Sequence, residues 1–172
     1  MNPVLGVLFV CTGNVCRSPY AERRAASLSR RHRFASAGTH ALAGAPMDAH
    51  MAHEARVRGA HTDGFWSKQL TQDLADAADL ILTAEAQQRR WILADWPRLS
   101  RRILTVGQFA ALLPGEPTGW SPWEVVADVI ERRGTSSSAL DVPDPYRKGP
   151  EAARACADLL DGHLTRIFAH LG

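Results

Sequence analysis

A cysteine and an arginine in C-x5-R spacing stand close to the N-terminus, directly after an apolar run. The segment reads Cys11, Thr12, Gly13, Asn14, Val15, Cys16, Arg17, Ser18, Pro19. Gly13 and Asn14 tolerate unusual backbone dihedrals, so this loop can curl its N–H groups inward and form a nest for an anion. A helix that begins near Pro19 adds partial positive charge at the same point. We therefore predict a phosphate-binding loop over residues 12–18.

The residue types in this loop suit phosphoryl transfer to sulfur. Helix N-termini and neighbouring cations favour the thiolate form of a cysteine, so we expect Cys11 to be an ionised nucleophile at neutral pH. Arg17 offers a planar fork that can hold two phosphate oxygens at once. Transfer of the phosphoryl group to Cys11, followed by hydrolysis of the thiophosphate, is the reaction that this pair favours.

A leaving alkoxide or phenoxide also needs a proton, and a second motif offers one. Asp144 lies between Pro143 and Pro145 and is followed by Tyr146. The two prolines stiffen the chain and restrict where the carboxyl group points. We therefore predict that Asp144 is the general acid, although it is distant from Cys11 in the sequence.

Alternating strands and helices must position these residues. Apolar runs predict strands at 4–10, 33–37, 80–83 and 103–106. Helical spacing predicts helices at 19–30, 47–57 and 85–93, an extra helix at 120–133 and a long C-terminal helix. The apolar stripe of that last helix comprises Ala152, Cys156, Leu159, Leu160, His163, Leu164, Ile167 and Leu171. The pattern predicts an α/β fold, with an open parallel sheet and helices on both faces.

Length and composition support one globular domain over residues 1–172. The net charge is only +2, from 20 basic and 18 acidic residues, which argues against a nucleic-acid binder. No apolar run is long enough for a membrane span, and no basic residue precedes the first apolar run as in a signal peptide.

The odd count of three cysteines favours reduced thiols and a cytoplasmic protein. His50 and His53 lack a completing ligand set, so we expect no metal and no cofactor.

Four motifs together resemble the low-molecular-weight protein tyrosine phosphatases. They are VLFVCTGNVCRSP at 7–19, SAGT at 36–39, DLILT at 79–83 and DPY at 144–146. The resemblance implies a four-stranded parallel sheet in a flavodoxin-like three-layer arrangement. It implies that Cys11 is the nucleophile, that Arg17 binds phosphate and that Asp144 is the general acid. It also implies that Ser18 steadies the leaving thiolate, that Asn14 holds the shape of the loop, and that Leu42 and Tyr146 form the two lips of the substrate pocket.

The chain departs from the family pattern in two places. Phe65 aligns where many members carry a histidine that braces the loop asparagine, and Arg147 and Lys148 follow Tyr146 in place of a second aromatic residue. We predict a cysteine-dependent phosphatase of phosphotyrosine in proteins, and these departures motivate the alternative of a small phosphorylated metabolite as the substrate. Cys16 is either a redox partner of Cys11 or a small packing residue.

Two further hypotheses remain. Arsenate reduction uses the same fold and loop, but its relay of additional cysteines looks incomplete here. A phosphate-binding module without catalysis would need neither the nucleophile nor the acid.

Secondary roles are also predicted for single residues. Asp48 caps the helix that follows it, and Glu85 either orients the site or serves as a first-turn helix charge. Trp120 and Trp123 line the substrate entrance. Nothing in the sequence indicates the oligomeric state.

Overall fold

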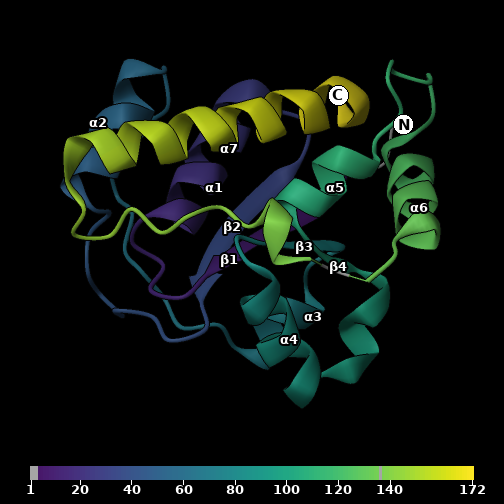
Figure 1. The fold of residues 1–172 in the computed structure, drawn as a ribbon, viewed down its shortest axis with the longest axis horizontal. Helices are drawn as coiled ribbons and strands as arrows, with labels where there is room; N and C mark the ends of the chain where they lie inside the picture. Colours follow the sequence, from purple (N-terminus) through teal and green to yellow (C-terminus); the bar gives the residue numbers. More distant parts are fainter. Residues whose placement is uncertain (1–3, 136) are drawn as a thin grey trace.

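A four-stranded parallel sheet forms the centre of the computed structural model, which describes residues 4–135 and 137–172 (Figure 1). β1 (Gly6–Cys11) pairs with β2 (Arg33–Gly38) on one side and with β3 (Leu80–Thr83) on the other. β4 (Ile103–Thr105) pairs with β3, and the strand order is β2-β1-β3-β4. The predicted fold class is confirmed. Four strand ends differ from the prediction. β1 runs from Gly6 to Cys11 rather than over 4–10, and β2 extends one residue further, to Gly38. β4 stops at Thr105 because a helix begins at Val106.

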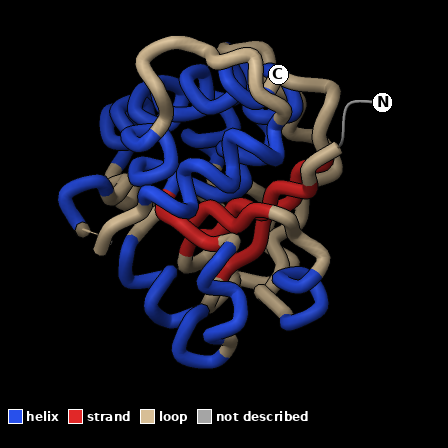
Figure 2. The backbone as a smooth tube through the Cα atoms, turned by 90° about the vertical axis from the view of Figure 1, so that its right-hand side faces the viewer, coloured by secondary structure: helices blue, strands red, loops and turns tan. Residues whose placement is uncertain are grey.

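Helices cover both faces of the sheet (Figure 2). One face packs against α1 (Arg17–Leu28), α2 (Ala49–Val57), α5 (Val106–Leu112), α6 (Pro122–Arg132) and α7 (Gly149–Leu171). The other face packs against α3 (Gln72–Asp76), α4 (Ala86–Asp95) and the 3-10 helix η1 (Pro97–Arg101). Successive side chains of a strand point to opposite faces, so Val7 and Phe9 enter the first core and Leu8 and Val10 the second. Cys11, the last strand residue, is therefore held by a strand that is buried on both faces.

The C-terminal helix α7 buries most of the predicted stripe, but not all of it. Leu159 is 38% exposed, and Ala152 and His163 are only partly buried. Ala153 and Ala157 take the buried positions instead. The buried face of α7 is thus rotated slightly from the predicted stripe towards these two alanines.

The long connection between β4 and Asp144 is mostly helical rather than an open loop. It contains α5, α6 and the short 3-10 helix η2 (Ser138–Leu140). α6 begins at Pro122 rather than at Trp120, because Ser121 and Glu124 form a capping box there. Gly107 in α5 lies directly against the backbone carbonyl of Leu140, where any side chain would overlap it. α5 therefore supports the segment that leads to Asp144.

Among the described residues, no helix is both long enough and apolar enough to cross a lipid bilayer.

Candidate active site

Neighbouring segments hold the loop that follows β1 by donating hydrogen bonds to its outward-facing carbonyl groups. The N–H groups of Thr39, His40, Leu42 and Asp48 donate to the carbonyls of Cys11, Thr12, Gly13 and Val15, with N···O distances of 2.8–3.0 Å. Asn14 adopts the left-handed conformation (φ 54°) that the curled backbone requires. Within the described chain, the N–H groups of residues 12–17 have no acceptor. This is the polarity that an anion nest needs, with carbonyls bound outward and N–H groups left over.

The sulfur of Cys11 lies in a short chain of polar side chains. Ser18 Oγ is 3.0 Å from Cys11 Sγ. The side-chain amide of Asn14 donates to Ser18 Oγ at 2.9 Å. The hydroxyl of Ser18 also lies 3.4 Å from the carbonyl of Ala37, which is the more distant of its two acceptors. Because a thiolate can only accept, Ser18 donates to the sulfur when Cys11 is ionised and so stabilises that form. All three side chains are buried, so water does not compete with these bonds.

The other hydrogen-bond partners of Asn14 are a serine and a backbone N–H group rather than a histidine. Its amide also donates to Ser36 Oγ at 3.0 Å, and its side-chain carbonyl accepts from the backbone N–H of Lys68 at 2.9 Å. Phe65, at the position where a bracing histidine was expected, is buried in the core with the guanidinium of Arg23 5.6 Å from its ring centroid. The serine of the SAGT motif therefore supplies a bracing contact that the sequence alone did not reveal.

Arg17 is almost fully buried beside the loop, and its guanidinium is held from three directions. One terminal nitrogen forms an ion pair with Glu85 and donates to the backbone carbonyl of Val142 at 2.9 Å. The other terminal nitrogen lies 3.5 Å from Asp144 Oδ2. Within the described chain the Nε group has no acceptor, so it is available to an incoming anion.

The charge of Arg17 is secure despite its burial. Burial acts against the charged form, but the Cys11 thiolate, the Glu85 hydrogen bond and the Asp144 carboxylate outweigh it. The pKa of the Arg17 guanidinium is consequently raised above its ordinary value. Glu85 also belongs to the capping box at the start of α4, where it is the N-cap residue and not, as the alternative prediction had it, a charge in the first turn.

Asp144 is brought to the loop from the distant end of the chain. Its side chain is 45% exposed, so it reaches both Arg17 and solvent. The preceding residues are anchored: Val142 N–H donates to the Ala84 carbonyl at 2.9 Å, and Asp141 accepts from Ala86 N–H at 2.7 Å. Sequence reasoning missed the anchoring role of Asp141, whose only signal was its place two residues before Pro143.

The two predicted lips differ in how they are supported. Leu42 is exposed and its N–H is bonded to the loop carbonyl of Gly13, which places it at the rim of the loop. Tyr146 is partly buried, and its N–H donates to Asp144 Oδ1 at 3.3 Å. The guanidinium of Arg147 lies 5.1 Å from the centroid of the Tyr146 ring.

The other two cysteines are buried thiols. Burial is the main cause that raises the pKa of Cys156, to about 12, and it raises the pKa of Cys16 further, with the charge of Asp48 adding to it. Both therefore stay protonated at neutral pH. Cys156 lies on the face of α7 that packs into the hydrophobic core, as predicted.

Three of the secondary predictions concern residues away from the sulfur. Asp48 caps α2 by accepting from His50 N–H and Met51 N–H, which confirms its predicted role. His50 and His53 are exposed, and no cluster of three metal-ligating side chains occurs in residues 4–135 and 137–172. The prediction for Trp123 is wrong. It lines a pocket with Asp79 and Arg102, which precede β3 and β4, whereas Cys11 lies at the opposite, carboxyl ends of the strands.

Fold and loop together define a class of protein. A parallel sheet carries, at the carboxyl end of its central strand, a buried cysteine, a buried arginine and a row of unpaired N–H groups on one loop. This arrangement is that of a cysteine-based phosphate-binding site at the start of a helix.

Comparisons with known proteins then assign the family. Residues 6–116 match the model of the low molecular weight phosphotyrosine protein phosphatase. The phosphatase Etp of Escherichia coli K12 is 30% identical over 146 residues, which cover 85% of this chain and 80% of Etp. Wzb of Salmonella typhimurium is 30% identical over 90% of this chain and 86% of its own. The chain belongs to the low molecular weight phosphotyrosine protein phosphatase family.

Solved structures agree with this assignment. Wzb of Escherichia coli K30, in complex with sulphate, superposes with a TM-score of 0.77 at 25% identity, covering 99% of this chain and 100% of that one. Wzb of Vibrio vulnificus, in complex with benzylphosphonate, has a TM-score of 0.73 at 28% identity, covering 95% and 96%. The family model ends before Asp144, so the contact between Asp144 and Arg17 is a result of the structure and not of that match.

Proposed function

We propose that the protein hydrolyses phosphotyrosine in proteins through a phosphocysteine intermediate on Cys11. The thiolate attacks phosphorus and forms the S–P bond as the ester P–O bond breaks, and Asp144 gives its proton to the leaving phenoxide. Asp144 then takes a proton from water, which attacks phosphorus and releases phosphate and the Cys11 thiolate. Ser18 stabilises that thiolate as it leaves, and Arg17 with the loop N–H groups at Thr12–Arg17 binds the phosphoryl oxygens throughout.

The observation that carries this proposal is the placing of Cys11, Arg17 and Asp144 around one set of free N–H donors. A nucleophile, an anion clamp and a proton donor are the three parts that this reaction needs. The relatives Etp and Wzb are named as protein-tyrosine phosphatases, which supports the substrate class. We assign Leu42 and Tyr146 to the lips of the pocket, where they would contact the aromatic ring of the substrate. The unpaired, reduced cysteines favour a cytoplasmic location.

Hydrolysis of an aryl phosphate by the purified protein tests the assignment. We expect Cys11→Ser to abolish phosphate release, and Asp144→Asn to lower kcat by about 100-fold to 10,000-fold, the usual contribution of a positioned general acid. Cys156→Ala is the matched control, because it removes a buried thiol that takes no part in the chemistry. Full activity in Cys11→Ser would overturn the proposal.

One observation favours a second candidate, a phosphatase of small metabolites. Arg147 lies against the Tyr146 ring and is followed by exposed Lys148, so one lip carries positive charge as well as aromatic surface. Acidic phosphorylated metabolites would benefit from that charge. Values of kcat/KM for a phosphotyrosyl peptide and for a panel of metabolite phosphates separate the candidates, and a clear preference for the metabolites would displace the tyrosine assignment.

Arsenate reduction has little support. It needs reactive thiols beyond the nucleophile, but Cys16 and Cys156 are both buried with raised pKa values. A thiol-coupled arsenate assay is expected to show no turnover.

A further inference from the structure

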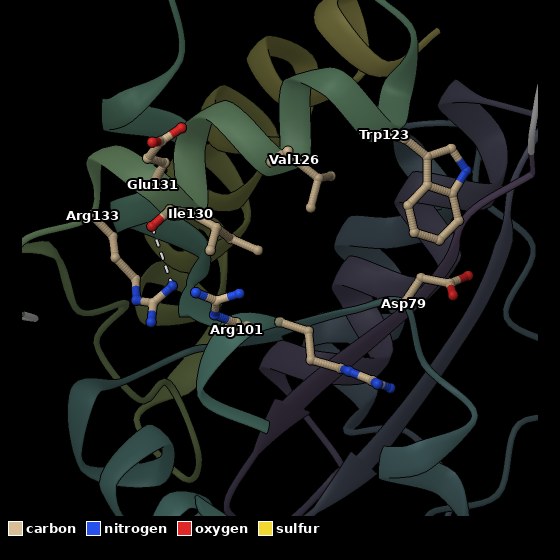
Figure 3. Close-up of a pocket in the computed structure, with 9 residues that line it drawn as sticks. Asp79, Arg101, Trp123, Val126, Ile130, Glu131 and Arg133 are labelled. Atoms are coloured by element: carbon tan, nitrogen blue, oxygen red, sulfur yellow. Dashed lines mark hydrogen bonds between the residues drawn. The ribbon is translucent and has the colours of Figure 1, made fainter. Parts of the chain in front are cut away.

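A cleft with a volume of about 790 Å³ opens between α6 and the N-terminal edge of the sheet (Figure 3). Its volume falls within the range of small-molecule sites, about 300–1,000 Å³. Val126 and Ile130 point from α6 into the cleft and form an apolar wall. The cleft is separate from the phosphate loop, because Asp79 and Arg102 lie where β3 and β4 begin, whereas Cys11 lies where β1 ends.

Three arginines line this cleft, and none of them has a carboxylate partner in the part of the chain that the structure describes. Within residues 4–135 and 137–172, Arg102 donates only to the backbone carbonyls of Asp76 and Ala78, and Arg133 only to that of Ile130. Arg101 is exposed and, among the residues that the structure describes, has no hydrogen-bond or ion-pair partner.

Several arginines elsewhere in the protein are neutralised by carboxylates. Arg24, Arg58, Arg98 and Arg132 each form an ion pair with a carboxylate. Glu131 also lines the cleft, but its carboxylate points away from the guanidinium groups in Figure 3. The cleft therefore carries positive charge that no side chain within it neutralises by direct pairing.

The neighbouring guanidinium group of Arg89 also indicates an excess of positive charge near the cleft. The pKa of Arg89 is lowered, first by burial and then by repulsion from the nearby charge of Arg133. An anion bound in the cleft would offset that repulsion.

The end of the cleft away from Arg133 is lined by an aromatic and an acidic side chain. Trp123 is 41% exposed and its indole lines this end of the cleft, where Asp79 also lies in Figure 3. One carboxylate oxygen of Asp79 already accepts from Gly6 N–H at 2.7 Å, which fixes the side chain. An aromatic face and a fixed carboxylate suit a planar ring and a hydroxyl or amino donor.

We propose that this cleft binds a nucleoside diphosphate, with its phosphates on Arg101, Arg102 and Arg133 and its base on Trp123. The three guanidinium groups outnumber the two carboxylates, Asp79 and Glu131, that line the same cleft. A guanidinium group binds phosphate oxygens in pairs, which suits the several oxygens of a diphosphate. An inorganic anion would leave the apolar wall and the indole uncovered. The proposal concerns a second site and does not depend on the activity assigned to Cys11.

The test uses the full chain and the non-hydrolysable probe α,β-methylene adenosine diphosphate, followed by two-dimensional NMR. We expect shifted resonances at residues 101–102 and 122–133, including the indole N–H of Trp123, and saturation at one ligand per chain. Arg101→Gln and Trp123→Ala are each expected to weaken binding by about tenfold, as the loss of one charged hydrogen bond or one stacking contact does. Arg90→Gln on α4 is the control, since this exposed arginine does not line the cleft.

Three results would overturn the proposal. The first is a set of shifts confined to residues 12–18, which would mean that the probe binds only at the phosphate loop. The second is equal weakening in Arg101→Gln and Arg90→Gln, which would mean general charge attraction. The third is equally tight binding of inorganic pyrophosphate or of an acidic peptide in the cleft, which would mean that no nucleoside is recognised. Because the cleft is remote from Cys11, Arg101→Gln should leave aryl phosphate hydrolysis unchanged.

Discussion

Replacing Ser18 by alanine should slow the second half of the reaction more than the first. Ser18 Oγ lies 3.0 Å from Cys11 Sγ, and Asn14 orients it by donating to the same oxygen at 2.9 Å. The hydroxyl is buried, so in Ser18→Ala no bulk water replaces the lost donor. The variant therefore loses one hydrogen bond to a thiolate that is leaving phosphorus.

The size of the effect follows from that single bond. A hydrogen bond to a charged group contributes about 1.5–3 kcal/mol. Each 1.36 kcal/mol changes a rate tenfold, so hydrolysis of the phosphocysteine should slow by about 10-fold to about 150-fold. Formation of the intermediate should slow less, because a weakly bonded thiolate is still a nucleophile.

Stopped-flow measurement of nitrophenol release from para-nitrophenyl phosphate separates the two steps. We expect Ser18→Ala to show a rapid burst of about one nitrophenol per active site before a slow steady state. Ser36→Ala is the matched control, because Ser36 contacts Asn14 but not the sulfur, and it should keep a steady state closer to that of the unmodified protein. A Ser18→Ala variant with unchanged kcat and no burst would refute the role assigned to this hydroxyl.

Three further changes have defined outcomes. Glu85→Gln removes the charge that pairs with buried Arg17 and should lower the free energy of unfolding by about 1–3 kcal/mol in urea titrations; an unchanged midpoint would contradict the ion pair. Gly107→Ala places a methyl group against the carbonyl of Leu140 in η2 and should lower the free energy of unfolding by about 1–3 kcal/mol, whereas Gly162→Ala, at an exposed position of α7, meets nothing and should be neutral or stabilising. Burial raises the pKa of Cys156 from 9.0 to about 12, so its contribution to stability is complete below pH 9 and is lost as the pH rises towards 12. Cys156→Ala should therefore show a shallower loss of stability from pH 9 to 11, and an identical slope would contradict this.

The parts of the site that are contiguous in sequence were predictable from the sequence. Cys11, Arg17 and Ser18 lie on one strand–loop–helix unit, and the local pattern of an apolar run, a glycine and a helix-starting Ser-Pro pair carries that information. The parallel sheet was predictable for the same reason, since buried parallel strands appear as short apolar runs.

The parts of the site that depend on tertiary contacts were not predictable. Nothing local indicates that Ser36 and the backbone of Lys68 brace Asn14, or that Asp141 anchors the acid segment to α4. α5 was missed because Val106 was assigned to the end of the fourth strand, whereas Thr105 in fact caps a helix that begins at Val106. Trp123 was predicted at the wrong end of the sheet. The sequence around an exposed tryptophan does not indicate whether the residue lies at the amino or the carboxyl ends of the strands.

The phosphocysteine intermediate is tested most directly by stopping the reaction in acid during turnover of an aryl phosphate and locating the bound phosphoryl group by peptide mass spectrometry. We expect a phosphorylated peptide that contains Cys11, with the modification on that sulfur and with more of it in Ser18→Ala. Turnover that continues with no phosphorylated Cys11 at any time, or with the phosphoryl group on another residue, would contradict it.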